Sequence, residues 1–496
     1  MRNYKTPGVY PEEISTLPPS VAPVETAIPA FIGYTEKRPS NSIEAYRISS
    51  MTEYQALFGG PFSEPFPNIE VSKAGEFFEV QQLPLAPARP TYWMYYQLKM
   101  FFANGGSSCY IVPVKLYGGG VDRTELEKGI NALKKEDEPT LIVIPDAIGV
   151  LPPNPNDISL SNFYGLYKNA LAQCAEMKDR FTIIDIHKGT EELSATNPTI
   201  ADFRTKIGSN FLNYGAAYFP WLFTTLSYYY DESQVPVGGA DLPEIDTKLK
   251  YDTSDLSVLS DDPEEDGTPF PDEDAKRNYY ENRSLYHLDN GSYRRIKAEL
   301  DAFNITLPPS GAIAGIYAQV DSTRGVFKAP ANVSLNNVIR PAVKINNEQQ
   351  EGLNVHPTGK SVNAIRTFTG KGVIVWGART LDGNSNEWRY IPVRRLFLFI
   401  EESISKSIDR FVFEPNDEGT WVKVKGTIEN FLSDQWRAGA LAGSTTKQAF
   451  FVNIGLGVTM TPQDILEGRL IVDVGLAAVR PAEFIVLRFS HKLQEA

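Results

Sequence analysis

Two apolar stretches, TLIVIPDA at 140–147 and FTIIDIH at 181–187, decide the fold of the central chain. Between them, Leu166, Ala170 and Cys174 recur every four residues, which places them on a single stripe of a helix. Unbroken apolar runs of this length are typical of strands that are buried on both faces of a parallel sheet. Their alternation with an amphipathic helix predicts an α/β layer in which the sheet is largely parallel.

The same alternation continues outside these two strands. Thr91 is a predicted N-cap for an aromatic-rich helix over 92–102, which precedes an apolar run at 109–114. Asp122 and Glu125 have the spacing of a capping box and predict the start of another helix. These signals extend the predicted α/β layer well beyond its two defining strands.

Length and composition limit the class of protein. The chain has 496 residues, of which 42% are hydrophobic, so it can bury sizeable cores and is expected to divide into two or more domains. No apolar run approaches the roughly 18 residues of a membrane span, and the first residues lack the apolar core of a secretory signal. We therefore expect no membrane insertion and no Sec export. The formal charge of −13 argues against a partner as anionic as nucleic acid.

The negative charge is concentrated in a single stretch. Residues 231–280 contain 15 acidic and 4 basic side chains, are rich in Pro and Gly, and show no helical or alternating period. This composition predicts a solvated acidic surface insertion over about 231–285. The alternative is an acidic docking or calcium loop, but the spacing of a helix-loop-helix calcium site is absent.

The amino-acid composition changes from about residue 310, where Gly and Ala are frequent and charged residues are few. Such segments favour close packing and tight turns, and a second domain is expected to begin nearby. A helix is predicted over 393–413, where apolar residues recur every three or four positions, and another from about residue 421.

The far end of the chain is predicted to be strand. The segments 469–479 and 484–492 both alternate apolar and other residues, and the second places Ile485, Leu487 and Phe489 on one face. No further covering helix follows, so the edges of these strands need a partner. A strand contributed by another chain would supply it, which is β-augmentation.

Residues that could carry catalysis are scattered. The two cysteines are not at metal-ligand spacing, and no HExxH or Cys/His cluster occurs. Two glycine-containing segments are alternatives as phosphate or anion sites. The segment 352–361 lacks the first glycine of a phosphate-binding loop, and 117–122 is better explained as a strand-to-helix turn. We therefore predict no catalytic, cofactor or metal site. The four histidines occur singly, at His187, His287, His356 and His491.

The opposite end of the chain is predicted to be an extended arm. Six prolines within residues 1–30 exclude both a helix and a central strand. Twenty extended residues reach on the order of 60 Å, against a radius of gyration near ~22 Å for the remaining chain. Such an arm can cross onto a neighbouring subunit. It can equally lie along its own domain.

Several long segments resemble contractile-tail sheath proteins, which occur in myophage tails and bacterial contractile injection systems. They include YKTPGVYPEEISTLPPSVAPVETAIPAFIGYT at 4–35, PPSGAIAGIYAQVDSTRGVFKAPAN at 308–332 and LNNVIRPAVKINNEQQEGLN at 335–354. NAIRTFTGKGVIVWGARTL at 363–381 and RPAEFIVLRFSHKLQ at 480–494 resemble the carboxyl-terminal sheath domain. The likeness covers both ends and the middle of the chain.

The resemblance implies an α+β and α/β multidomain chain. Residues 1–25 would be an extended N-terminal arm, and 26–330 an outer α/β body that carries the acidic insertion. Residues 331–478 would be an inner α+β sheath assembly domain, and 479–496 a C-terminal strand arm. Such subunits form hexameric rings that stack helically around an inner tube, and contraction drives the tube through a target envelope.

The resemblance also implies partners and functional residues. The partners are further copies of the chain, the inner tube protein, and baseplate and terminal cap proteins, without any cofactor. Assembly in the bacterial cytoplasm would precede incorporation into a phage virion or an extracellular or membrane-anchored particle. Lys406 and Arg410, on the polar side of the helix at 393–413, are candidates for contact with the tube. The arm residues expected between subunits are Tyr4, Val9, Tyr10, Ile14, Ile485, Leu487 and Phe489, with hinges at Pro18, Pro19, Arg480 and Pro481.

Two other functions compete with this interpretation. The alternating strands and helices could belong to a hydrolase, but fold likeness does not carry activity, and no Asp, His and Ser occupy recognisable triad motifs. The chain could instead be a surface-binding or cap module built from the sheath fold. Such a protein would stay a discrete particle, whereas a sheath would form long hollow cylinders.

Overall fold

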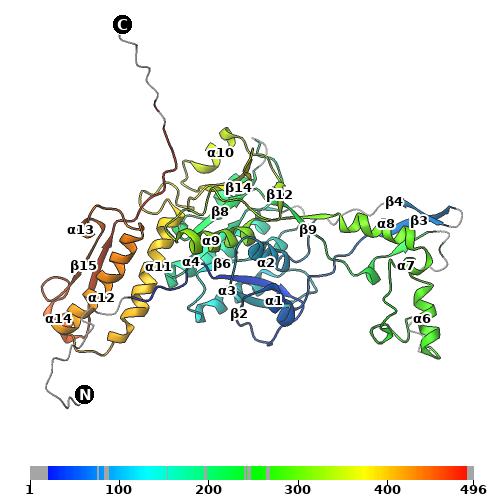
Figure 1. The fold of residues 1–496 in the computed structure, drawn as a ribbon, viewed down its shortest axis with the longest axis horizontal. Coiled ribbons are helices and arrows are strands. Elements are labelled where there is room, and N and C mark those ends of the chain that lie inside the picture. The colour runs from blue at the N-terminus through cyan, green and yellow to red at the C-terminus, as the bar shows by residue number, and fades with distance from the viewer. Residues whose placement is uncertain are drawn as a thin grey trace, which may run out of the picture. The chain divides into compact units, whose positions relative to one another are not determined.

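The computed structural model describes residues 21–74, 77–82, 89–152, 155–194, 198–239, 242, 247–263, 269–486 and 488. The chain forms two compact units, which are described separately (Figure 1). The first contains residues 27–323 and 329–391 and is called the α/β unit. The second contains residues 324–328 and the chain from 392 onward, together with 21–26, and is called the C-terminal unit.

An eight-stranded sheet is the centre of the α/β unit. Its order is β14-β13-β8-β7-β6-β1-β5-β2, and the six inner strands run parallel to one another. The edge strands β14 and β2 are antiparallel to their neighbours. The parallel sheet predicted from the alternating apolar runs is therefore confirmed. The strands are β1 (Pro29–Thr35), β2 (Tyr46–Ile48), β5 (Cys109–Leu116), β6 (Leu141–Val143), β7 (Phe181–Asp185), β8 (Gly215–Phe219), β13 (Val362–Phe368) and β14 (Gly372–Trp376).

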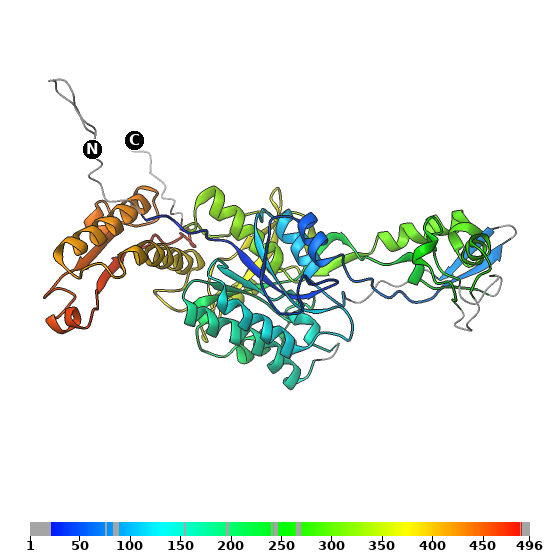
Figure 2. The same ribbon diagram turned by 90° about the horizontal axis from the view of Figure 1, so that it is seen from below.

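Helices cover both faces of this sheet (Figure 2). On one face α3 packs against β5 and α4, while α4 packs against β7. On the other, α9 lies so close to α2 that a Cβ at Gly315 would be 2.5 Å from the carbonyl oxygen of Phe101. Glycine is required there because the backbones approach so closely. The helices of the unit include α1 (Met51–Phe58), α2 (Met94–Ala103), α3 (Arg123–Ala132), α4 (Asp157–Met177), α5 (Thr199–Lys206), α9 (Ser310–Arg324) and α10 (Asn347–Asn354).

The start of α2 corrects one prediction. Thr91 does not cap the helix, because its hydroxyl and its main-chain N–H both donate to the Glu64 carboxylate, at 2.7 Å. The helix begins at Met94, and the main-chain N–H of Trp93 donates to the buried carboxylate of Asp146 at 2.5 Å. A distant residue therefore supplies the cap that the local sequence was expected to provide.

Two smaller sheets complete the α/β unit, and part of the acidic insertion is folded beside one of them. Asp272 caps α6 by accepting from the N–H of Ala275 at 2.7 Å. Lys276 is buried and donates to the carbonyl oxygen of Leu259 and to Asp261. The prediction of an aperiodic solvated loop was therefore wrong for this helix. The elements are β3 (Ile69–Ala74), β4 (Phe77–Gln82), β9 (Leu222–Ser227), β10 (Val237–Gly238), β11 (Asn304–Leu307), β12 (Val338–Pro341), α6 (Glu273–Glu281), α7 (Leu285–Leu288) and α8 (Asn290–Asp301).

The division between the units differs from the expected domain boundary at residue 331. Strands β12, β13 and β14 and helix α10 all belong to the α/β unit, because β13 pairs in parallel with β8. The contiguous part of the C-terminal unit starts at residue 392. Pairing between strands that are remote in sequence, rather than a change in composition, sets this boundary.

The C-terminal unit has two long helices over a two-stranded sheet. Its core includes Leu396 and Ile400 of α11 with Ile428, Phe431 and Leu432 of α12, as the predicted helical stripes required. Helix α11 ends at Ile408 and not at 413, and Asp417 caps α12 by accepting from the N–H of Thr420 at 2.9 Å. The elements are α11 (Ile391–Ile408), α12 (Glu418–Arg437), α13 (Thr446–Ala449), α14 (Pro462–Leu466), β15 (Phe450–Ile454) and β16 (Val472–Leu476).

The final strand predicted at 484–492 is not found in the described residues of that segment, 484–486 and 488. Nor do the described helices include one that is long and apolar enough to cross a membrane.

Candidate functional site: an open strand edge in the C-terminal unit

Strands β15 and β16 form an antiparallel ribbon with one apolar face. Phe450 pairs with Leu476, and Val452 pairs with Val474. The side chains of these four residues belong to the core made with α11 and α12, whereas Phe451 lies on the opposite face and is more than half exposed. The ribbon thus has an inner face that helps to build the core and an outer face in solvent.

The two edges of β16 differ. The N–H of Ala477 donates to the carbonyl oxygen of Ala449 at 2.8 Å, so residue 477 and every second residue before it face β15. By the same alternation, Val472, Val474 and Leu476 direct their main-chain N–H and C=O groups away from β15. Within the described chain no strand pairs with that outer edge. The edge is therefore free to accept a strand.

An apolar groove runs beside this edge. It has a volume of about 300 Å³ and lies between α11 and β16. Val474 and Leu476, which form its β16 side, are only partly buried although they contact the core. A strand added to β16 would place alternate side chains over this groove and complete the core. The lining residues are Phe397, Ile400, Glu401, Ile404, Ser405, Ile408, Val474 and Leu476.

In contrast to the outer edge of β16, both edges of the large sheet in the α/β unit are protected. Strand β14 is covered by the segment 332–335, where the N–H of Asn332 donates to the carbonyl oxygen of Val375 and that of Leu335 donates to Val373. At the other edge, β2 has only three residues. Covering an edge and shortening it both prevent unwanted pairing. The unprotected edge of β16 is a distinct feature of the C-terminal unit.

The described part of the N-terminal segment is anchored to the C-terminal unit. Val21 is buried in its core, and the N–H of Val24 donates to Ser403 Oγ at 3.2 Å. Arg395 donates to the carbonyl oxygen of Thr26 at 2.8 Å. The anchored segment thus includes Val21, the first described residue of the chain. The predicted arm and hinge residues Tyr4, Val9, Tyr10, Ile14, Pro18 and Pro19 lie outside the described residues.

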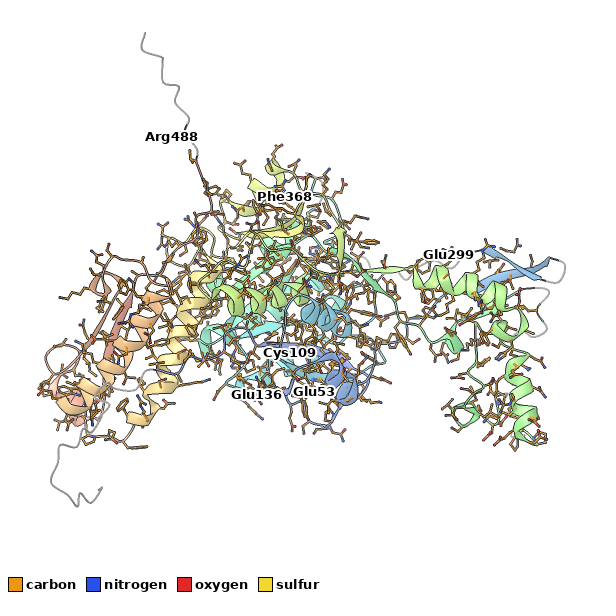
Figure 3. The ribbon with its side chains drawn as sticks, in the orientation of Figure 1. Glu53, Cys109, Glu136, Glu299, Phe368 and Arg488 are labelled. Atoms are coloured by element: carbon orange, nitrogen blue, oxygen red, sulfur yellow. The ribbon has the colours of Figure 1, made fainter. Side chains whose placement is uncertain are left out.

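Main-chain to main-chain hydrogen bonds hold the C-terminal segment as far as Val479. The N–H of Val479 donates to the carbonyl oxygen of Ala440 at 3.1 Å, and no later main-chain bond is found in the described residues. The predicted hinge residues Arg480 and Pro481 follow directly. Beyond them, Phe484, Ile485 and Val486 are 71%, 80% and 76% exposed, and Arg488 is exposed as well (Figure 3). The predicted arm residues Leu487 and Phe489 are not among the described residues.

The two residues expected to contact the tube are both exposed. Lys406 pairs with Glu402, one helical turn earlier, at 2.6 Å. Arg410 lies beyond the end of α11 in a short 3-10 turn, and its guanidinium carbon is 5.0 Å from the ring centre of Phe411. The structure brings the two cations to one end of the helix, and their role stays a prediction.

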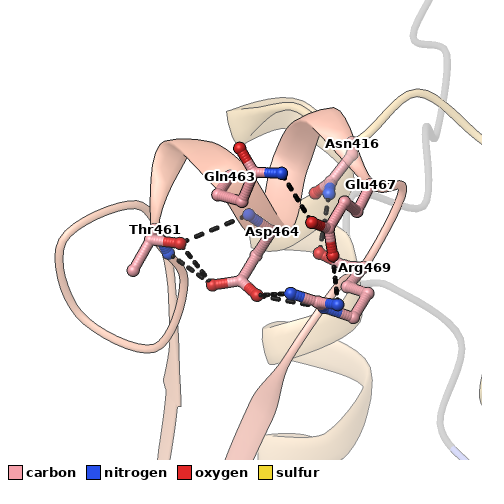
Figure 4. Close-up of polar contacts among 6 residues, drawn as sticks. All are labelled: Asn416, Thr461, Gln463, Asp464, Glu467 and Arg469. Atoms are coloured by element: carbon pink, nitrogen blue, oxygen red, sulfur yellow. Dashed lines mark hydrogen bonds and ion pairs between the residues drawn. The ribbon is translucent and has the colours of Figure 1, made fainter.

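A polar cluster that the sequence analysis missed fixes the loop between β15 and β16 (Figure 4). Thr461 and Asp464 form a capping box at α14, and Arg469 donates to the Asp464 carboxylate at 2.6 Å. Hydrogen bonds from Thr461 are the main cause that lowers the pKa of Asp464 to about 2. Asn416 donates to the carbonyl oxygen of Arg469 at 3.0 Å and so ties this loop to the α11–α12 connection. The Thr-Pro-x-Asp spacing at 461–464 was the available signal.

Two buried ionisable groups of the α/β unit, Asp185 and His187, make hydrogen bonds within the fold. Asp185 accepts from the N–H and hydroxyl of Ser310 and so holds the start of α9. Burial raises the pKa of Asp185 to about 7. His187 is bonded through Nδ1 to the Tyr164 hydroxyl at 2.9 Å, and burial lowers its pKa to about 4. Among the described residues, no group of His, Cys, Asp and Glu is arranged to hold a metal ion.

Two family models match successive parts of the chain. The phage tail sheath protein central domain matches residues 270–381, and the phage tail sheath C-terminal domain matches residues 384–492. The second match contains α11, α12 and the β15–β16 ribbon. The open edge of β16 thus lies within the part of the chain that matches a phage tail sheath domain.

Individual relatives agree with these matches. The chain is 28% identical over 154 residues to the tail sheath protein of Vibrio phage KVP40, which covers 30% of this chain and 22% of that protein. It is 24% identical over 144 residues to the tail sheath protein of Salmonella phage ViI, which covers 28% and 22%. The chain thus matches only about a fifth of the length of each phage protein.

Solved structures match over nearly the whole chain. The helical sheath of the anti-feeding prophage in its contracted state has a TM-score of 0.61 and 29% identity, over 99% of this chain and 100% of that chain. The sheath complex of the extracellular contractile injection system PVC, also contracted, has a TM-score of 0.59 and 29% identity, over 99% of both chains. The chain belongs to the contractile tail sheath proteins.

Proposed function

We propose that this chain is the sheath subunit of a contractile injection machine, that it polymerises as stacked hexameric rings around an inner tube, and that it contracts to drive the tube through a target envelope. The open outer edge of β16 beside its apolar groove carries the proposal, because it is an unfilled strand position in a family of assembling proteins. The likeness to two contracted sheath assemblies supports the same function.

The terminal arms of neighbouring copies are the proposed occupants of the ribbon edges. The C-terminal segment FIVLRFSHK at 484–492 alternates in the way a strand over the groove requires. If it pairs with the outer edge of β16, Ile485, Leu487 and Phe489 can face the groove together. The exposure of Ile485 in the single chain is consistent with a partner on another copy.

The arms are proposed to keep the lattice connected while the subunit bodies move. The main-chain bonds that end at Val479 and the burial of Val21 support the proposed hinges, Arg480 with Pro481 and Pro18 with Pro19. Reversing a two-state population from 1:99 to 99:1 needs about 5.5 kcal/mol in total, which is below about 0.1 kcal/mol per subunit when on the order of a hundred subunits cooperate. The switch itself is therefore undemanding, and additional energy stored in the lattice is free to do work.

Other parts of the proposal follow from the sheath role. The partners are the inner tube protein, baseplate proteins and a terminal cap protein, and no cofactor takes part. The likeness to an anti-feeding prophage baseplate, with 29% identity and a TM-score of 0.61, supports a place next to a baseplate. The particle is assembled in the cytoplasm and then acts as a phage tail or as an extracellular or membrane-anchored injection particle.

Deletion of residues 1–20 tests the arm hypothesis. The anchor at Val21 and Val24 remains, so the shortened subunit is expected to fold with a melting temperature close to that of the full chain. It is also expected to lose the ability to form cylinders, as seen by negative-stain microscopy. Normal cylinders from the shortened chain would contradict the proposal. Discrete particles from the full chain would favour the cap or surface-binding alternative.

A further inference from the structure

A large cleft in the α/β unit is lined by residues that take no part in the proposed strand addition at β16. It has a volume of about 680 Å³ and lies between the loop after α1, helix α2 and the segment that follows β9. Six of its lining side chains are aromatic. Ligand-binding clefts commonly have this size and combine ring surfaces with a few polar groups. The aromatic residues are Phe62, Tyr95, Tyr96, Tyr117, Tyr228 and Tyr229.

The walls of the cleft are held in place by hydrogen bonds. The N–H of Gly60 donates to Glu36 Oε2 at 2.6 Å, and Gln55 Nε2 donates to the Tyr95 hydroxyl at 2.9 Å. The N–H of Tyr229 donates to the Tyr96 hydroxyl at 3.1 Å. A cleft that is already formed loses little conformational entropy when a ligand binds.

The polar groups of the cleft include both signs of charge. Glu36 and Asp231 are carboxylates, Gln55 is an amide, and Lys99 is a cation. The Lys99 ammonium lies 5.0 Å from the centre of the Tyr95 ring, and among the described residues no carboxylate is within ion-pair distance of it. Its three N–H donors are therefore available to a ligand.

These groups narrow the chemical class of the ligand. The two carboxylates disfavour an anion, and the central Lys99 disfavours a cation. A wholly apolar ligand would cover the second carboxylate oxygens of Glu36 and Asp231 and the side-chain carbonyl of Gln55, which accept no hydrogen bond within the described residues. Leaving each of them without a partner would cost roughly 1–3 kcal/mol. What remains is a neutral ligand whose hydroxyl groups both donate and accept and whose ring faces can lie on aromatic side chains.

Tyr229 extends the site. Its side chain is 48% exposed and lines both this cleft and a second one of about 460 Å³, in which Lys250 and Asp252 are further polar groups. The two clefts share Asp231 as well as Tyr229. A chain of several linked units could therefore cross the Tyr229 ring and use polar groups on both sides.

We infer that the paired clefts around Tyr229 form a binding site for a neutral oligosaccharide, with one sugar ring stacked on Tyr229 and hydroxyl groups bonded by Gln55, Lys99 and Asp231. This site would give the sheath subunit a second contact, with a glycan, that is separate from strand addition in the C-terminal unit. None of its residues belongs to the β15–β16 ribbon or its groove.

The site is tested on the full chain by isothermal titration with chitohexaose, maltohexaose and mannohexaose. We expect at least one of them to bind with a dissociation constant on the order of 0.1–1 mM. Tyr229→Ala should weaken that binding about tenfold, and Tyr229→Trp should restore it because a ring face is present again. Trp376→Ala is the matched control, since Trp376 is another partly exposed aromatic side chain but lies on β14 outside both clefts.

Three results would overturn the inference. One is the absence of binding by all three hexaoses at about 10 mM, well above the expected dissociation constant. Another is an equal loss of affinity in the Tyr229→Ala and Trp376→Ala variants. The third is displacement of the saccharide from the wild-type chain by a peptide that copies residues 1–20, which would indicate a site for a protein arm. Tyr229→Ala should still form cylinders, so failure here is distinguishable from failure of the sheath proposal.

Discussion

Replacement of Val474 by proline tests the open edge of β16 directly. The main-chain N–H of Val474 points away from β15, so proline removes a donor that the ribbon itself does not use. The same donor is required by any strand that pairs with the outer edge. Val474→Pro should therefore block strand addition while the β15–β16 pairing stays intact.

The size of the effect follows from the geometry of the edge. Val472, Val474 and Leu476 offer three N–H and three C=O groups, so an added strand can form roughly six hydrogen bonds. At about 0.5–1.5 kcal/mol net for each, the main-chain contribution is about 3–9 kcal/mol. Proline removes one bond and leaves a carbonyl of the incoming strand without its partner, a loss of about 1–3 kcal/mol. Each subunit contact should then weaken by about 5- to 150-fold.

The assay combines assembly with a check of folding. Sedimentation velocity and negative-stain microscopy measure cylinder formation, and thermal unfolding followed by circular dichroism reports the stability of the subunit. Gly475→Pro is the matched control, because Gly475 faces β15 and pairs with Phe451. That control should lower the melting temperature, whereas Val474→Pro should change it little.

Assembly of Val474→Pro subunits like the wild type would refute strand addition at the outer edge of β16. A second variant tests the groove beside the edge, and its thermal unfolding is measured in the same way. Leu476→Lys places a charge in the apolar groove and should also prevent assembly, while Asn453→Lys, on the exposed face of the same ribbon, should not.

Three further predictions concern other parts of the chain. Reversal of charge at Lys406 and Arg410 together should reduce co-sedimentation of tube with sheath, with Arg437→Glu as an exposed control; unchanged co-sedimentation would remove both residues from the tube contact. Gly315→Val should lower the free energy of unfolding by about 1–3 kcal/mol, because the new side chain on α9 would meet the carbonyl oxygen of Phe101 on α2. Gly352→Ala is the control, because its added Cβ meets nothing within 4 Å, and it should raise the free energy of unfolding by about 0.5–1 kcal/mol. If urea denaturation gave the same change for both glycine variants, the close packing at Gly315 would be contradicted. The pKa of Asp185 is raised to about 7 by burial, so its protonated form stabilises the fold fully below about pH 4 and that stabilisation is lost as the pH rises through 7. The melting temperature of Asp185→Asn minus that of the wild type should therefore increase as the pH rises from 4 to 8. A difference that stays constant over that range would argue against the raised pKa of Asp185.

The elements that could be predicted from the sequence are those whose signals are local. The apolar runs at 140–147 and 181–187 indicated buried parallel strands, and β6 and β7 lie within them, although β6 spans only Leu141–Val143 and a 3-10 helix follows it. The periods of α11 and α12 indicated helices with one apolar face, and both were found with that face in the core. Helix ends were less accurate where a tertiary contact supplied the cap, as Asp146 does for α2.

Long-range pairing decided the rest. The unit boundary lies near 392 because β13 joins β8, and no composition change marks that choice. The acidic stretch was expected to be loop throughout, yet it contains α6, because Lys276 is buried against Leu259 and Asp261.

For the candidate site, too, the sequence predicted some features and only the tertiary structure showed others. Alternating residues in the final segments indicated strands in need of partners, since side-chain alternation is a property of the local chain. Only the tertiary structure decided which edge is open, because the β15–β16 register directs the free groups of Val474 outward and α11 forms the groove beside them. The cleft around Tyr229 likewise could not be assembled from sequence patterns, since its walls come from five separate parts of the chain that the fold brings together.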